Sequence, residues 1–313
     1  MAAFIARRLF TGVLLLITVC TIAFYLLYLG SDTVAHAILG VDATKAGIAH
    51  FNEIHGLNRP FLSQYSDWIA HAVRGDFGLP WTSTQPVAEA LRTRMGVTLI
   101  LAISALTLSA IFSVLLGVTA ALRGGWVDRA VQVLGLAGFA VPNFLLAFLL
   151  VAVFAVQHHV FNAVGWNPPN QGFGAFLKSA VLPVMALSFA GLASVTQQVR
   201  GAVKDTLQLD FIRTLRTGGL SFKRVVFKHA LRNAAAPALS ILGLQFVGLL
   251  GGAVIIEQIF AIPGLGQFSV DATTAKDLPS VMGIVTLTAI LVISVNLLID
   301  LLSAAMNPKV RLS

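Results

Sequence analysis

Charged side chains and cysteine are scarce in this sequence of 313 residues. Only 11% of the residues are charged, against about 25% in soluble domains, while 57% are hydrophobic and the mean hydropathy is +0.86. This balance excludes an ordinary soluble domain. Cys20 is the single cysteine, so neither an intramolecular disulfide nor a cysteine-based metal site can form. Three patterns typical of enzymes are also missing, namely the phosphate loop GxxxxGK(S/T), HExxH and GxSxG, and we expect no enzymatic activity.

Long apolar stretches dominate instead. A helix needs about 20 residues to cross about 30 Å of hydrocarbon, and six charge-free windows are long enough. They are residues 9–30, 95–122, 130–157, 179–199, 233–256 and 278–299. The sequence therefore predicts an all-α integral membrane protein with six transmembrane helices, whose two termini lie on the same side.

Lysine and arginine are distributed unevenly over the two sides of these spans. With the N-terminus inside, 14 of them lie on the inner side and 7 on the outer side. Because inner loops carry the excess of positive charge, we expect cytoplasmic N- and C-termini. The net charge of +8 then follows from topology and does not indicate nucleic-acid binding. Arg7 and Arg8 precede an apolar run longer than a signal-peptide core, so residues 1–30 are expected to remain as a transmembrane helix.

Residues 31–94 form a polar insertion of 64 residues, which this topology places outside. An insertion of this length is expected to fold into structure of its own. Residues 61–73 follow helical spacing, residues 75–78 are typical of a turn, and Pro86 suits the first turn of a second short helix. The insertion either meets a partner protein or serves as a packing lid. Residues 95–313 are expected to form a core domain of five helices.

Few polar side chains lie within the spans. We expect Pro142-Asn143 to bend the third span, because proline removes a backbone donor, and Leu182-Pro183 to open the fourth. Polar residues inside spans more often bond a neighbouring helix than a solute. The candidates for a translocation path are Asn143, Ser188, Gln245 and Asn296.

Ionisable groups within the spans are rarer still. Glu257 and Asp300 lie at the ends of spans, where we expect water to reach them. His158 and His159 are adjacent and would point to different faces of a helix, so an interfacial position is favoured over metal binding.

Residues 200–232 form the only long charged interruption in the C-terminal half, with eight Lys or Arg and two acids. Four apolar residues fall on one stripe at helical spacing: Leu207, Phe211, Ile212 and Leu215. The pattern predicts a short helix over about residues 205–217 whose apolar face needs a protein groove. Gly218-Gly219 is expected to end this helix, and Ser221 to cap the next one.

The order of residues in this segment resembles the cytoplasmic loop of ABC importer permeases, above all those of the peptide/nickel class. The matching residues are 211–214, 219–221, 229–234 and Pro237. In that family the loop carries a coupling helix that docks on the ATP-hydrolysing subunit. The resemblance assigns this role to Asp210, Phe211, Ile212, Arg213, Thr214, Leu215, Arg216, Gly219 and Leu220. Arg213 stands where the broad family has glutamate, a departure that is usual in the peptide class. The alternative is a plain basic loop that obeys the positive-inside rule.

The resemblance extends over most of the chain. Residues 58–78 are similar to the extracytoplasmic region of peptide-class permeases, which contributes to the surface met by a substrate-binding protein. Residues 123–128 follow an RG-x3-D pattern, which we interpret as a tight turn. The stretches 257–266, 296–300 and 307–309 match further family patterns, whereas Lys276 and Leu278 depart from them.

The resemblance implies a type I ABC importer permease of the dipeptide/oligopeptide B type. Such a subunit moves di- or oligopeptides across the bacterial cytoplasmic membrane by alternating access; nickel chelates, glutathione and haem are alternative cargoes. The implied partners are a second homologous permease, two ABC ATPase subunits that bind ATP and Mg, an extracytoplasmic substrate-binding protein and membrane lipid, with no cofactor in this chain.

Two other classes of protein are more remote. An ion-coupled secondary transporter would need ionisable groups within its spans. An intramembrane enzyme would need paired carboxylates or a Ser/His/Lys set there.

Overall fold

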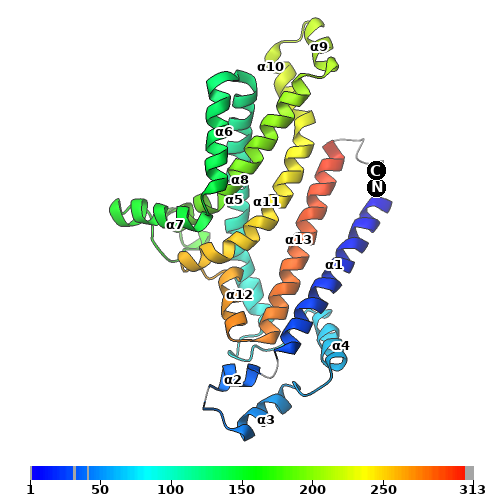
Figure 1. The fold of residues 1–313 in the computed structure, drawn as a ribbon, viewed down its shortest axis with the longest axis vertical. Coiled ribbons are helices and arrows are strands. Elements are labelled where there is room, and N and C mark those ends of the chain that lie inside the picture. The colour runs from blue at the N-terminus through cyan, green and yellow to red at the C-terminus, as the bar shows by residue number, and fades with distance from the viewer. Residues whose placement is uncertain (1, 31–32, 41, 307–313) are drawn as a thin grey trace. The chain divides into compact units, whose positions relative to one another are not determined.

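The computed structural model describes residues 2–306 apart from 31, 32 and 41. The expectations on residue 31 and on residues 307–309, as well as Arg311 in the charge count, fall outside the described residues. Within the described part of the chain all regular structure is helical, which confirms the all-α prediction. The helices, drawn in Figure 1, are α1 (Ala2–Leu29), α2 (Val34–Leu39), α3 (Lys45–Ile54), α4 (Phe61–Ala72), α5 (Val87–Arg123), α6 (Gly125–Ala140), α7 (Asn143–Leu150), η2 (Val151–Gln157), η3 (Pro169–Gln171), α8 (Phe173–Leu207), α9 (Asp210–Thr217), α10 (Phe222–Arg224), η4 (Val225–Ala230), α11 (Leu231–Ile259), α12 (Leu265–Thr274) and α13 (Leu278–Met306).

Four continuous helices are long and apolar enough to cross a membrane: Phe4–Leu29, Val87–Arg123, Pro237–Ile259 and Leu278–Ala305. Two bent pairs raise the number to as many as six among the described residues. Gly125–Gly138 and Asn143–Gln157 meet at 97°, and Phe173–Phe189 and Gly191–Leu207 meet at 50°. The first bend confirms the prediction at Pro142-Asn143, and Figure 1 shows α7 turning sharply away from α6.

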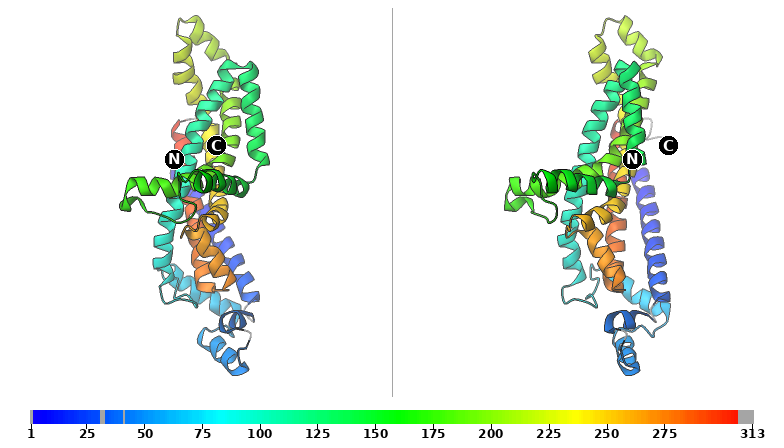
Figure 2. Two further views of the ribbon diagram at one scale, coloured as in Figure 1. Left: turned by 90° about the vertical axis from the view of Figure 1, so that its left-hand side faces the viewer. Right: turned by 60° about the vertical axis from the view of Figure 1, so that its left-hand side comes forward.

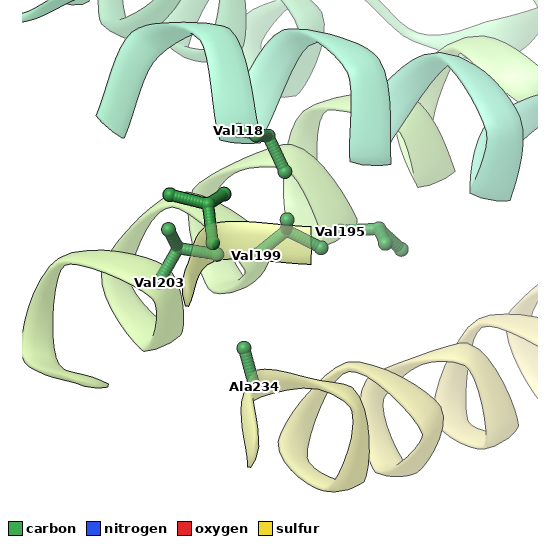
Figure 3. Packing of buried hydrophobic residues seen from close by; sticks show 6 residues of the cluster. Val118, Val195, Val199, Val203 and Ala234 are labelled. Atoms are coloured by element: carbon green, nitrogen blue, oxygen red, sulfur yellow. The ribbon is translucent and has the colours of Figure 1, made fainter. Parts of the chain in front are cut away.

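The chain divides into two compact units. The first comprises Leu99–Ile262 with residues 294–306, and in it α8 packs against α11, α6 and α7. Figures 1 and 2 show the end of α5, α6 and α8 running side by side. A buried aliphatic cluster joins α5, α8, η4 and α11 (Figure 3); its members are Val118, Val195, Val199, Val203, Val226 and Ala234. A methyl group added to Gly117 would lie 2.9 Å from the carbonyl oxygen of Thr196, so α5 and α8 touch at backbone distance.

The second unit comprises residues 2–98 and 263–293. It contains α1 to α4, the start of α5, α12 and the first part of α13. The side chain of Phe24 on α1 lies 5.2–5.9 Å from the rings of Phe61, Tyr65 and Trp68 on α4. The insertion therefore has helices of its own, as expected, and one of them packs on α1. The expected domain boundaries at 30/31 and 94/95 stay predictions.

Two expectations about helix ends were wrong. No separate short helix follows Pro86, because α5 runs without interruption from Val87 to Arg123, with Val87 and Leu91 packed against α12 and α13. Pro183 does not open the fourth span either. It lies inside α8, which begins ten residues earlier at Phe173; neighbouring helices and side chains make an interior proline tolerable in membrane helices.

Candidate coupling site

Helix α9 is a separate eight-residue helix between α8 and α10 (Figures 1 and 2). The expected helix over 205–217 is therefore in two pieces, because α8 ends at Leu207 and Leu209 is extended, with φ −68° and ψ 144°. At the other end the prediction is confirmed. The Gly218 and Leu220 amides donate to the Thr214 and Leu215 carbonyls at 2.9 and 3.2 Å. Gly219 has φ +85°, a conformation that glycine adopts without strain.

One face of α9 is buried inside the chain. Ile212 is only 2% exposed and packs against Val225 and Ala230 of η4. Leu207, Leu215 and Leu220 surround this contact. Part of the protein groove that the apolar face was expected to need is therefore supplied by this chain itself, at Ile212.

The neighbouring residue points elsewhere. Phe211 is 39% exposed, because consecutive residues are about 100° apart around a helix. The Arg213 and Asp210 side chains are 78% and 98% exposed and lie 3.7 Å apart, a surface pair that contributes little stability. Arg216 lies over the ring of Phe222 at 5.5 Å. The outward face of α9 thus offers an aromatic ring and guanidinium groups.

The chain continues from α9 into the membrane helix α11 through α10 and η4. Ser221 occupies the N-cap position of α10 but makes no side-chain capping bond, in contrast to the expectation. Helices α10, η4 and α11 follow one another without a break from Phe222 to Ile259. The packed contact at Ile212 joins α9 to η4, which continues into α11.

Asp128 forms a charged cluster that the sequence reasoning missed. The tight turn at residues 123–128 is confirmed, with φ of +62° and +56° at Gly124 and Gly125. Asp128 follows in the first turn of α6 and is 8% exposed. Arg200 donates through Nε to Oδ1 and through Nη2 to Oδ2 at 2.8 Å, and Lys204 Nζ donates to Oδ2 at 2.7 Å.

The spacing of the two cations could have indicated this cluster. Arg200 and Lys204 are four residues apart on α8 and so share one face. Their common acceptor is 72 and 76 residues away in sequence, and only the topology of the unit brings it close.

The four path candidates all lie where helices of the first unit meet. Ser188 is buried, and its carbonyl accepts a hydrogen bond from Ser109 Oγ of α5 at 2.8 Å. The others face glycines. A methyl group added to Gly191 would lie 2.7 Å from Gln245 Nε2, and one added to Gly252 would lie 3.7 Å from Asn143 Nδ2. A methyl group added to Gly243 would lie 3.6 Å from Asn296 Oδ1. Packing between helices explains these positions, and their role in a path stays a prediction.

The expectation that water reaches Glu257 was wrong, because this side chain is 0% exposed. The chain turns back just after α11. The Ile262 amide donates to the Glu257 carbonyl at 2.8 Å, and the Gly165 amide donates to the Phe260 carbonyl at 2.7 Å. Asp300 is half-buried within α13.

No group of three or more His, Cys, Asp or Glu that could hold a metal occurs in residues 2–306, leaving aside 31, 32 and 41. His158 and His159 are exposed. The site comprises the short helix α9, the helix that continues from it and the Asp128 ion-pair cluster.

The sequence matches one family over almost its whole length. Residues 113–312 match the profile described as binding-protein-dependent transport system inner membrane component, and residues 1–102 match the profile of its N-terminal part. The chain belongs to this family. It is a multi-pass membrane permease subunit of an ABC importer.

Individual relatives are similar from end to end. The probable peptide ABC transporter permease protein y4tP of Sinorhizobium fredii is 33% identical over 99% of this chain and 100% of its own length. The glutathione transport system permease protein GsiC of Escherichia coli K12 and a putative peptide transport system permease protein of Brucella abortus are each 34% identical over 99% of both chains.

Proposed function

We propose that this permease forms half of the membrane pathway of an importer for di- or oligopeptides, driven by ATP hydrolysis in separate subunits. The end-to-end similarity to relatives named as peptide and glutathione permeases carries the proposal. Glutathione is itself a short peptide, so these names share one chemistry: a flexible backbone with a charged amine and a charged carboxylate. Glutathione alone, nickel chelates and haem are the alternative cargoes.

The proposed partners are a second homologous permease, two ABC ATPases, an extracytoplasmic substrate-binding protein and the surrounding lipid. Up to six spans in one chain are too few to enclose a peptide path and also present one docking helix to each of two ATPases. We place both termini, α9 and Asp128 on the cytoplasmic side of a bacterial inner membrane, and α2 to α4 on the outer side. The Lys/Arg distribution supports this orientation.

The proposed coupling element is α9 with the turn at Gly219 and Leu220. Differences in exposure favour some of the candidate residues over others for contact with an ATPase. Phe211 is exposed, as are Asp210, Arg213, Thr214 and Arg216, whereas Ile212 and Leu215 pack within the chain. An exposed aromatic anchor among guanidinium groups suits a groove with an acidic rim.

The cargo can be tested in the reconstituted complex. We expect di- and oligopeptides, supplied with the binding protein, to stimulate ATP hydrolysis and to accumulate in proteoliposomes. The matched controls are glutathione, haem and a nickel chelate at equal concentration. Stimulation by glutathione alone, or by haem or nickel and not by peptides, would assign the importer to that cargo instead.

A further inference from the structure

We propose that Asp128 is a positioning residue for transport. Its ion pairs hold the cytoplasmic end of α6 against α8, so that α9, the end of α8 and the α5–α6 hairpin move as one rigid unit. This inference rests on the proposed coupling role of α9. It assigns a mechanical function to a carboxylate that lies outside α9 and outside the path candidates.

The bonding of Asp128 differs from that of the other described ion pair near α9. Both carboxylate oxygens are engaged, by the two-pronged Arg200 guanidinium and by Lys204 Nζ, and the carboxylate is largely buried. Such a fork fixes direction as well as distance. The Asp210–Arg213 pair joins neighbouring turns of one helix at 3.7 Å and is almost fully exposed. The Asp128 cluster, by contrast, ties two different helices together by charge.

The cluster lies next to the packing that holds α9. Leu207, three residues after Lys204, packs both against the aliphatic cluster of Figure 3 and against the contact around Ile212. A push on α9 is thereby transmitted to the end of α8. Asp128 passes the same displacement from α8 to α6.

Helix α5 is held to α8 by the valine cluster and by the hydrogen bond from Ser109, whereas the contact of α6 with α8 depends on close packing at glycines. Helix α6 of this hairpin meets α8 at two glycines. A methyl group added to Gly135 would lie 2.6 Å from Gln197 Nε2, and one added to Gly138 would lie 2.9 Å from Ala193 Cβ. Sliding of packed helices is a common movement in proteins. A cavity of about 160 Å³, lined by α5, α6 and α8, further interrupts the contact. A directional bond at the cytoplasmic end removes this freedom.

The first test separates coupling from assembly. Asp128→Asn keeps the shape of the side chain and removes its charge, and Asp205→Asn is the matched control, since Asp205 lies one residue after Lys204 but is exposed. In purified complexes that retain their ATPase subunits, we expect Asp128→Asn to hydrolyse ATP while the amount of peptide taken up per ATP falls by about tenfold. A tenfold change corresponds to the loss of about 1.4 kcal/mol of charge-assisted bonding. Asp205→Asn should keep the wild-type ratio.

The second test measures directly whether α6 and α8 move together. Spin labels at Trp126→Cys and Gln208→Cys, both exposed positions, report the distance between the start of α6 and the end of α8. We expect a single narrow distance that ATP does not change, and a broad or shifted distance in Asp128→Asn. A loss of stability alone would not alter the distance in molecules that remain folded.

The outcomes distinguish this inference from the proposed function. If the wild-type complex shows no ATP-driven uptake, the proposed function fails. If the wild type transports and Asp128→Asn keeps both its uptake per ATP and its narrow distance, only the inference fails. Lys204→Gln, which leaves the Arg200 fork intact, should give a smaller loss of coupling. If both variants fail to assemble, the cluster is a folding element and the inference is overturned.

Discussion

The attachment of α9 to the rest of the chain can be tested by Ile212→Ala. The substitution removes three carbon atoms from a side chain that is 2% exposed and packed against Val225 and Ala230. Truncations of this kind cost about 2–5 kcal/mol, the sum of the lost burial and the cavity left behind. We take about 3 kcal/mol as the expected loss. It falls on α9 and not on the whole fold, because a helix of eight residues is not stable without tertiary packing.

Hydrogen exchange measures this local loss. The amides of Gly218 and Leu220 bond to carbonyls of α9, so they exchange only when α9 opens. A loss of about 3 kcal/mol should speed their exchange by about 100-fold. Amides in the middle of α11 should exchange at the wild-type rate.

Phe211→Ala is the matched control, since it truncates the adjacent but exposed side chain. We expect it to leave exchange in α9 unchanged and to weaken retention of the ATPase subunits during purification. Unchanged exchange in Ile212→Ala would refute the assignment of Ile212 to internal packing. Full retention of the ATPase in Phe211→Ala would refute the assignment of Phe211 to the docking face.

Two further predictions concern packing and orientation. Gly117→Ala should lower the stability of the purified protein by about 1–3 kcal/mol, because the added methyl group meets the Thr196 carbonyl at 2.9 Å. Gly248→Ala is the control and should not lower the stability, since nothing lies within 4 Å of the added methyl group. Equal melting temperatures of the two variants would contradict the close packing at Gly117. In a cysteine-free background, an impermeant thiol reagent should label Ser83→Cys in intact cells and Ser221→Cys only after permeabilisation, and the reverse pattern would invert the proposed topology.

Features that depend on a few neighbouring residues could be predicted from the sequence. The apolar windows, the bend at Pro142-Asn143 and the stop at Gly219 all follow from local backbone chemistry, and the structure confirms them. Proline and glycine act on the dihedral angles of their own segment, whatever packs around it. The extent of α5 was missed, because Val87 and Leu91 in its first turns are buried against the distant helices α12 and α13.

Features that depend on distant parts of the chain could not be predicted. Phe211 and Ile212 belong to the same apolar stripe, and only the position of η4 decides which of them is buried. Asp128 looks like an ordinary turn residue until α8 brings Arg200 beside it. Glu257 stands at the end of an apolar window, yet its side chain is buried. In each case burial is set by a contact that sequence periodicity does not contain.

Contacts between helices also bear on how cargo is selected under the proposed function. Ser188 lies where α8 meets α5, and Gln245 lies beside Gly191 where α11 meets α8, so contacts between helices account for both positions. Strong binding by a permeation path would also slow release, because a cargo must leave every site that it enters. Under the proposed function, selection among peptides then falls to the binding protein. We therefore expect exchange of the binding protein to change the range of transported peptides more than Gln245→Ala does.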